Sequence, residues 1–157
     1  MGEWDRRDSH MKNKTKILIA AILLLAISIG LTSIVRVKRE ETETQLIAGL
    51  SSGAVDSFSD LLYQLQQGET DYELSYRRAI CNFYALYHGV IFLSDIHNRD
   101  CSYKREMSAV YAYLLTRSEI DAETVEIIRT ACQAIGRKES ESSIGEWLLR
   151  ARNSMME

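Results

Sequence analysis

The sequence predicts an all-α protein, in which a single N-terminal transmembrane helix is followed by a small antiparallel bundle of about four helices. Three observations favour this fold class. The 157 residues include no proline, although an average usage of about 5% would give roughly eight. The run Ile17–Val35 contains no charged residue. In the rest of the chain, apolar residues recur at steps of three or four, the spacing of amphipathic helices.

The run Ile17–Val35 is long enough to cross a bilayer as a helix. At about 1.5 Å per residue it reaches roughly 28 Å, close to the hydrocarbon thickness of about 30 Å. The alternative is a cleaved signal peptide, whose apolar core of about 7–15 residues ends at a small-x-small cleavage site. Ser28-Ile29-Gly30 has that pattern but lies inside the run. We therefore expect an uncleaved signal anchor over residues 17–35, in the cell membrane.

The N-terminal tail, residues 1–16, suggests a second start site. Acidic residues dilute the positive charge of the first ten positions, whereas Met11 begins a segment with three lysines, Lys12, Lys14 and Lys16. Arg6-Arg7 encoded as AGG-AGG would form a bacterial ribosome-binding sequence before Met11. We hypothesise that translation starts at Met11 and that residues 1–10 are not translated.

The positive-inside rule alone does not orient the anchor, because three basic residues precede it and three, Arg36, Lys38 and Arg39, follow it. A short basic N-terminus usually stays in the cytoplasm, and a long following domain translocates regardless of charge. We therefore expect an N-inside, C-outside topology with an extracytoplasmic domain. Ala26 and Gly30 have the small-x-x-x-small spacing that lets two helices approach closely; they predict either a homodimer contact or an incidental pair in a monomeric span.

Residues 36–157 are expected to form the helical-bundle domain, beginning with a helix over about 36–67. The membrane helix can continue into it without a break. Ser51-Ser52-Gly53 is the expected place for a kink, because glycine weakens a helix, and Gly68 is the expected end. The apolar face of this helix comprises Ile47, Leu50, Ala54, Phe58, Leu61 and Leu65.

Two further helices are expected over about 70–96 and 103–118, separated by the polar break Asn98-Arg99-Asp100. Thr70 and Glu73 fit a capping box at the start of the first of them. Its apolar positions are Tyr76, Ile80, Phe83, Tyr87, Val90 and Ile91. Those of the second are Tyr103, Met107, Val110, Tyr111, Leu114 and Leu115.

The last two helices have clear start signals. Asp121 is the expected N-cap of the first, with Ile120 and Val125 as a hydrophobic staple and Gly136 at its end. Its apolar stripe is Val125, Ile128, Cys132 and Ile135. Ser143-x-x-Glu146 fits a capping box for the second, a short helix that packs as a lid or strut. Its buried side is Ile144, Trp147, Leu148, Ala151 and Met155.

Metal-ligating residue types occur in two groups, and neither predicts a metal site. Cys81, His88 and Asp95 are seven residues apart, about 10.5 Å of helical rise, so adjacent members cannot share an ion bound at roughly 2.0–2.3 Å. The same rise places Cys81 too far from His88 for the two to act as a catalytic pair. Asp95, His97, Asp100 and Cys101 cluster after the second bundle helix, but they match no known metal loop, and we expect a solvated turn.

The sequence also contains no sign of catalysis or of cofactor binding. It has no Gly-rich phosphate loop, no Gly-x-Ser-x-Gly and no His-Glu-x-x-His. The three cysteines include no Cys-x-x-Cys pair, and we expect three free thiols, two of them buried. A non-enzyme without a cofactor is the resulting expectation.

Aromatic residues are concentrated in the second and third bundle helices. They favour either a packed core, which is the commoner use of aromatics at helical spacing, or an aromatic ligand pocket. The residues are Tyr76, Phe83, Tyr84, Tyr87, Phe92, Tyr111 and Tyr113.

The net charge and the arrangement of an anchor followed by a helical bundle narrow the range of expected functions. Residues 36–157 carry 14 Lys/Arg against 19 Asp/Glu, without the basic stripe that nucleic-acid binding needs. The layout resembles bacterial membrane-tethered accessory proteins and sensor input domains. We expect a non-catalytic interaction module, bound to the lipid bilayer and to another membrane protein. The alternative is a ligand-sensing domain. A sensor must pass its signal across the membrane, and a cytoplasmic part of at most 16 residues argues against that role.

Overall fold

The computed structural model describes the backbone of residues 3–69, 71–98, 100–117 and 119–156, and the side chains of these residues from Ile22 onward. Within this part every regular element is a helix, which confirms the predicted all-α class. The chain divides into two compact units, Met1–Thr42 and Glu43–Glu157. The tail 1–16 and the proposed start at Met11 lie outside the described side chains.

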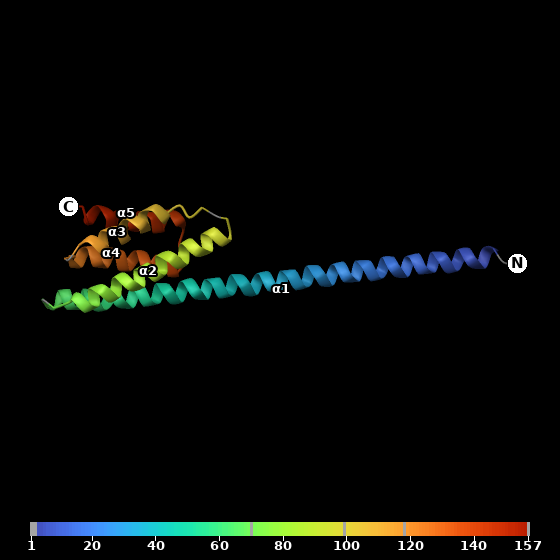
Figure 1. Cartoon of the computed structure of the whole chain (residues 1–157), viewed down its shortest axis with the longest axis horizontal. Helices are drawn as coiled ribbons and strands as arrows, with labels where there is room; N and C mark the ends of the chain where they lie inside the picture. The colour runs from blue at the N-terminus through green and yellow to red at the C-terminus, as the bar shows by residue number, and fades with distance from the viewer. Residues whose placement is uncertain (1–2, 70, 99, 118, 157) are drawn as a thin grey trace. The chain divides into compact units, whose positions relative to one another are not determined.

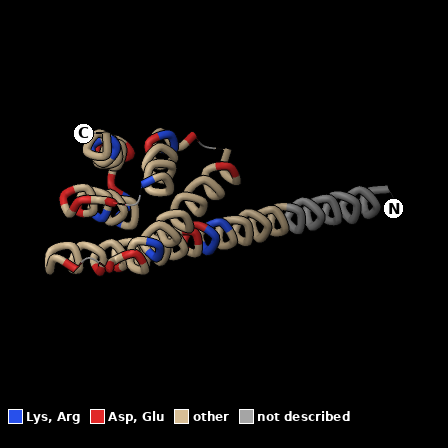
Figure 2. Tube along the Cα trace, turned by 60° about the vertical axis from the view of Figure 1, so that its left-hand side comes forward, with Lys and Arg blue, Asp and Glu red and all other residues tan. Residues whose placement is uncertain are grey.

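Helix α1, Glu3–Gln66, is continuous, as the sequence allowed. In the first unit its described side chains form an apolar stretch, seen as the tan part of α1 beside the grey segment (Figure 2). Each large aliphatic residue there is at least 56% exposed, a set that comprises Ile22, Leu23, Leu24, Leu25, Ile27, Ile29, Leu31, Ile34, Val35 and Val37. Folding of this unit leaves these side chains without apolar cover.

The helix that is long and apolar enough to cross a membrane, among the described residues, is α2, Glu73–Ile96. It is not the N-terminal run that the sequence predicted. Side chains 17–21 of that run lie outside the described ones, and Ile22–Val35 alone is shorter than the about 20 residues of a typical span. Helix α2 is this apolar because both its buried face and exposed residues such as Leu74 and Phe92 are apolar. This composition indicates membrane association.

The second unit is a bundle of five helical segments, one more than the predicted four, because the C-terminal part of α1 packs with the four helices that follow it. The C-terminal part of α1 is followed by α2, α3 (Lys104–Thr116), α4 (Ala122–Gly136) and α5 (Glu141–Ser154). Helix α5 packs on α3 and α4, and α3 packs on α2 (Figure 1). The last helix is thus a strut of the bundle, and its Leu148 is fully buried.

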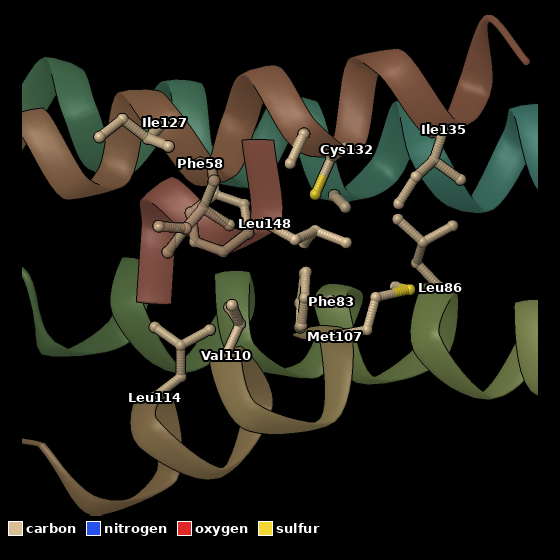
Figure 3. Close-up of a cluster of buried hydrophobic side chains, with 14 of the residues drawn as sticks. Phe58, Phe83, Leu86, Met107, Val110, Leu114, Ile127, Cys132, Ile135 and Leu148 are labelled. Carbon is tan, nitrogen blue, oxygen red and sulfur yellow. The ribbon is translucent and has the colours of Figure 1, made fainter. Parts of the chain in front are cut away.

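All five segments contribute side chains to one core (Figure 3). The predicted stripes supply most of it, because amphipathic helices pair by burying their apolar faces. Leu115 is an exception: it was expected on the apolar face of α3 but is 57% exposed. The largest fully buried side chains include Phe58, Leu61, Phe83, Leu86, Met107, Leu114, Ile128 and Leu148.

A residue with left-handed backbone conformation follows each of the helices α1, α2 and α4. Gly68 has φ of +71° after α1; its N–H bonds to Leu65 O and that of Glu69 to Gln64 O, the Schellman pattern. The predicted stop at Gly68 is therefore confirmed. Helix α4 ends at Gly136 as expected, but the left-handed residue is Lys138, with φ of +54°.

Two of the three predicted N-caps were wrong. Helix α2 begins at Glu73 after Tyr72, whose side chain makes no capping bond; Thr70 lies outside the described residues. The N-cap of helix α5 is Ser140, three residues before the predicted Ser143. Asp121 is confirmed, since its carboxylate accepts from the Thr124 N–H at 2.8 Å and the Thr124 hydroxyl at 2.6 Å.

The expected kink in α1 is also wrong. The helix continues through Ser51-Ser52-Gly53, and the first of these residues packs against α4. Ser51 is buried and its hydroxyl donates to the carbonyl oxygen of Cys132 on α4. A Cβ added at Gly136 would lie 2.3 Å from Ser51 Oγ. The glycine at the end of α4 therefore serves close helix approach.

Candidate functional site

The aromatic residues of α2 and α3 divide into a buried and an exposed group. Tyr76 and Phe83 are in the core, and Phe83 meets Phe58 of α1 edge-on, with ring centroids 6.2 Å apart. Phe92 is 61% exposed. The expected aromatic core is therefore confirmed for Tyr76 and Phe83 and is wrong for Phe92.

Three of the remaining residues, Tyr84, Tyr87 and Tyr111, form a half-exposed tyrosine cluster at the α2–α3 interface. The Tyr111 ring lies 5.2 Å from that of Tyr84 and 5.9 Å from that of Tyr87. His88 packs on the same cluster, 4.2 Å from the Tyr84 ring. Ring centroids at these distances are in the range of favourable aromatic pairs, so these side chains pack on one another.

A pocket of about 540 Å³ lies elsewhere, between the start of α2 and the end of α3. Of the predicted aromatics only Tyr76 lines it, and the Tyr76 hydroxyl donates to the carbonyl oxygen of Leu114 at 2.9 Å. The pocket thus has an apolar floor and a charged rim. The other lining residues are Tyr72, Glu73, Arg77, Ile80, Leu114, Leu115, Arg117 and Glu119.

The acidic and cysteine residues after α2 do not converge on one point. His97 Nε2 lies 2.5 Å from Glu43 Oε2 on α1, and Asp95 pairs with Lys104 at 3.7 Å. Cys101 is buried, whereas Asp100 is exposed. No group of three or more potential ligands able to hold a metal occurs among the residues whose side chains are described.

The expectation of a solvated turn was wrong for His97. Its half-buried ring and Glu43 connect the end of α2 to α1. The sequence gave no signal for this pairing, because the two residues are far apart in the chain and neither belongs to an apolar stripe. The contact places the C-terminal end of α2 beside the point where the chain enters the bundle.

The thiols lie as predicted, with three free cysteines of which Cys101 and Cys132 are buried. Burial raises the pKa of Cys132 to about 12. Burial also raises the pKa of Cys101, although a hydrogen bond with Tyr103 partly opposes it. Both are therefore protonated at neutral pH, and the thiolate is the nucleophilic form. Cys81 is exposed on α2.

Polar and small residues that the sequence analysis missed determine how α1 packs. Asn82 of α2 donates to the Gly53 carbonyl at 3.2 Å and to the Ser57 hydroxyl. A Cβ added at Gly89 would lie 2.5 Å from Leu50 Cδ1. The available signal was the occurrence of small residues on an otherwise apolar helix face, which is typical of close helix approach.

Ala26 and Gly30 are exposed in the first unit. A Cβ added at Gly30 would meet nothing within 4 Å, so there is room there for a second helix. Comparison with known proteins adds no assignment: no family model, curated protein or solved structure matches this chain.

Proposed function

We propose that the chain is a non-catalytic, single-pass membrane protein whose bundle acts as an interaction module for another protein of the same membrane. One observation carries this proposal: the described part of the predicted anchor, Ile22–Val35, is exposed, mostly apolar and uncharged, and it is followed by the basic residues Arg36, Lys38 and Arg39. Removing such a surface from water into a bilayer is favourable, and the basic residues suit its headgroup boundary.

The bundle supports a binding role over a chemical one. Its buried thiols are held protonated, and its histidines contact carboxylate or aromatic side chains. Mild net acidity favours a protein partner over nucleic acid. In the proposed topology the N-terminus is cytoplasmic and the bundle lies outside, and the exposed Ala26 and Gly30 are the proposed contact of a homodimer.

Fractionation of cells that produce the full chain tests the anchor. We expect the protein in the membrane pellet after an alkaline carbonate wash, with release only by detergent. A variant that lacks residues 17–35 is the control and is expected in the supernatant. Recovery of the unaltered chain in the supernatant would refute the anchor. Crosslinking in the membrane followed by affinity capture tests the partner, and capture of only the chain itself would favour the homodimer.

The pocket between α2 and α3 supports a second candidate, a ligand-sensing domain. Its volume of about 540 Å³ falls in the usual range of small-molecule sites, roughly 300–1,000 Å³. A thermal-shift screen of small amphipathic molecules against the full chain in detergent tests it. A stabilising compound whose effect disappears in Ile80→Trp, which fills the pocket, would support sensing; stabilisation that persists in this variant would place the compound elsewhere.

A further inference from the structure

The end of the bundle where the chain enters it, at Glu43, carries exposed apolar side chains. Leu46 is 45% exposed on α1, and Phe92 and Ile96 are 61% and 44% exposed on α2. His97 bonds to Glu43, and a Cβ on Gly89 would meet Ile47 and Leu50. These contacts fix the C-terminal end of α2 beside the first bundle turns of α1. Phe92 and Ile96 are four residues apart and so lie on one face of α2.

The apolar run and this end of the bundle are separated by a short stretch of chain. Only residues 36–42 lie between Val35 and Glu43, about 10 Å if helical at 1.5 Å per residue. The headgroup layer adds roughly 5–8 Å on each side of the hydrocarbon core. Chain connectivity alone therefore keeps Glu43 and the neighbouring end of α2 close to the lipid surface, wherever the rest of the bundle points.

We infer that the bundle rests on the lipid bilayer through Phe92 and Ile96, at the end that Glu43 and His97 mark. The inference depends on the proposed anchor. It accounts for an α2 that is more apolar than its packing requires, since these two side chains are outside the core. Because residues 36–157 are net acidic, apolar burial and not attraction to anionic lipid drives the contact, so a zwitterionic bilayer suffices.

Leu74 provides a matched control on the same helix. It is 73% exposed and lies five helical turns before Phe92, hence on the same face and about 27 Å away along the axis. Its end of α2 is far along the chain from the anchor. A contact confined to the Glu43 end brings Phe92 to lipid and leaves Leu74 in water, whereas a helix lying flat on the membrane would bring both to lipid.

The experiment uses the full chain with Cys81→Ser in phosphatidylcholine vesicles, with Phe92→Cys or Leu74→Cys labelled by an environment-sensitive NBD fluorophore. Cys101 and Cys132 are buried and serve as the unlabelled background. We expect blue-shifted emission for the Phe92→Cys conjugate, and quenching by brominated lipid at least about twofold stronger than for Leu74→Cys, as apolar side chains at the headgroup boundary give. Addition of anionic lipid should leave the difference unchanged.

Equal quenching of the two conjugates, or none at Phe92→Cys, would overturn the inference. Flotation of the same vesicles separates this result from failure of the anchor. Protein that floats without quenching at Phe92→Cys has an anchor but no contact between bundle and lipid. Protein that does not float shows that the proposed anchor itself is wrong.

Discussion

Phe83 and Phe92 lie on the same helix but differ in burial, and this difference sets the expected effect of truncating each. Phe83 is fully buried against Phe58, whereas Phe92 is 61% exposed. Phe83→Ala should lower the free energy of unfolding by about 3–5 kcal/mol, the usual cost of a cavity left by phenylalanine. Phe92→Ala should change it by no more than about 0.5 kcal/mol. Chemical denaturation of the full chain in detergent, followed by circular dichroism, measures both.

Glycines of the bundle offer a second comparison at the residue scale. A Cβ at Gly136 would overlap Ser51, whereas a Cβ at Gly49 would meet nothing within 4 Å. Gly136→Ala should therefore destabilise by about 1–3 kcal/mol, as overpacking does. Gly49→Ala should stabilise by up to about 1 kcal/mol, because alanine restricts the unfolded chain and favours helix. Similar melting temperatures for the two variants would refute the close packing of α1 on α4.

The residues that position α1 could not be predicted from the sequence. Ser51 and Gly136 matter because the side chain of Ser51 lies against the backbone of α4, and Glu43 and His97 matter because two distant segments meet. Periodicity identifies which face of a helix is buried, but it does not say which helix covers that face. The apolar residues of the core needed no such information, and most of them were predicted.

At the scale of elements, the ends of the helices separate local signals from tertiary ones. Asp121 and Gly68 were predictable because each acts on its own helix, through a capping bond and a left-handed turn. Tyr72 and Ser140 were missed. At those two helix starts the capping-box pattern lies at a different residue from the observed N-cap. Packing against neighbouring helices also determines where a helix starts.

The capping carboxylate of Asp121 makes the stability of α4 depend on pH. Burial opposes its ionisation, but hydrogen bonds from Thr124 outweigh this and hold the pKa below its usual value. A lowered folded-state pKa stabilises the fold fully above the ordinary pKa, and that contribution is lost as pH falls through the folded-state value. Asp121→Ala should cost about 0.5–2 kcal/mol at neutral pH and less in acid.

Ser140→Ala is the control for this prediction, because Ser140 caps α5 with a hydroxyl that does not titrate in this range. Its cost should be the same at neutral and acidic pH. Unfolding curves at the two pH values, recorded for both variants, check the difference. A cost for Asp121→Ala that does not change with pH would show that the carboxylate contributes as an uncharged acceptor.

At the scale of the whole molecule, the sequence predicted the helical class and the order of the helices, and it allowed the continuity of α1. It did not predict which helix would meet the length and composition criterion for a membrane span. Hydropathy alone does not distinguish an anchor from an apolar bundle helix, since both have long apolar segments. Burial separates them: α2 has a face in the core, and the described part of the N-terminal run has none.

The proposed topology is testable with a native residue. Cys81 is exposed, whereas Cys101 and Cys132 are buried. With the bundle outside, a membrane-impermeant maleimide applied to cells with a permeable outer layer and an intact inner membrane should modify Cys81. The variant Cys81→Ser should lose the signal. Modification that appears only after the inner membrane is broken would place the bundle in the cytoplasm.

Because the three thiols differ in burial, their modification rates also report transient opening of the core. Cys132 is fully buried with a pKa of about 12, so a thiol reagent reaches it only when the core opens. Its modification rate, divided by that of Cys81, reports how often such opening occurs. The ratio can be followed by mass spectrometry while the protein stays in its native bilayer. Fold stability thereby becomes measurable without denaturant, purification or an added label site.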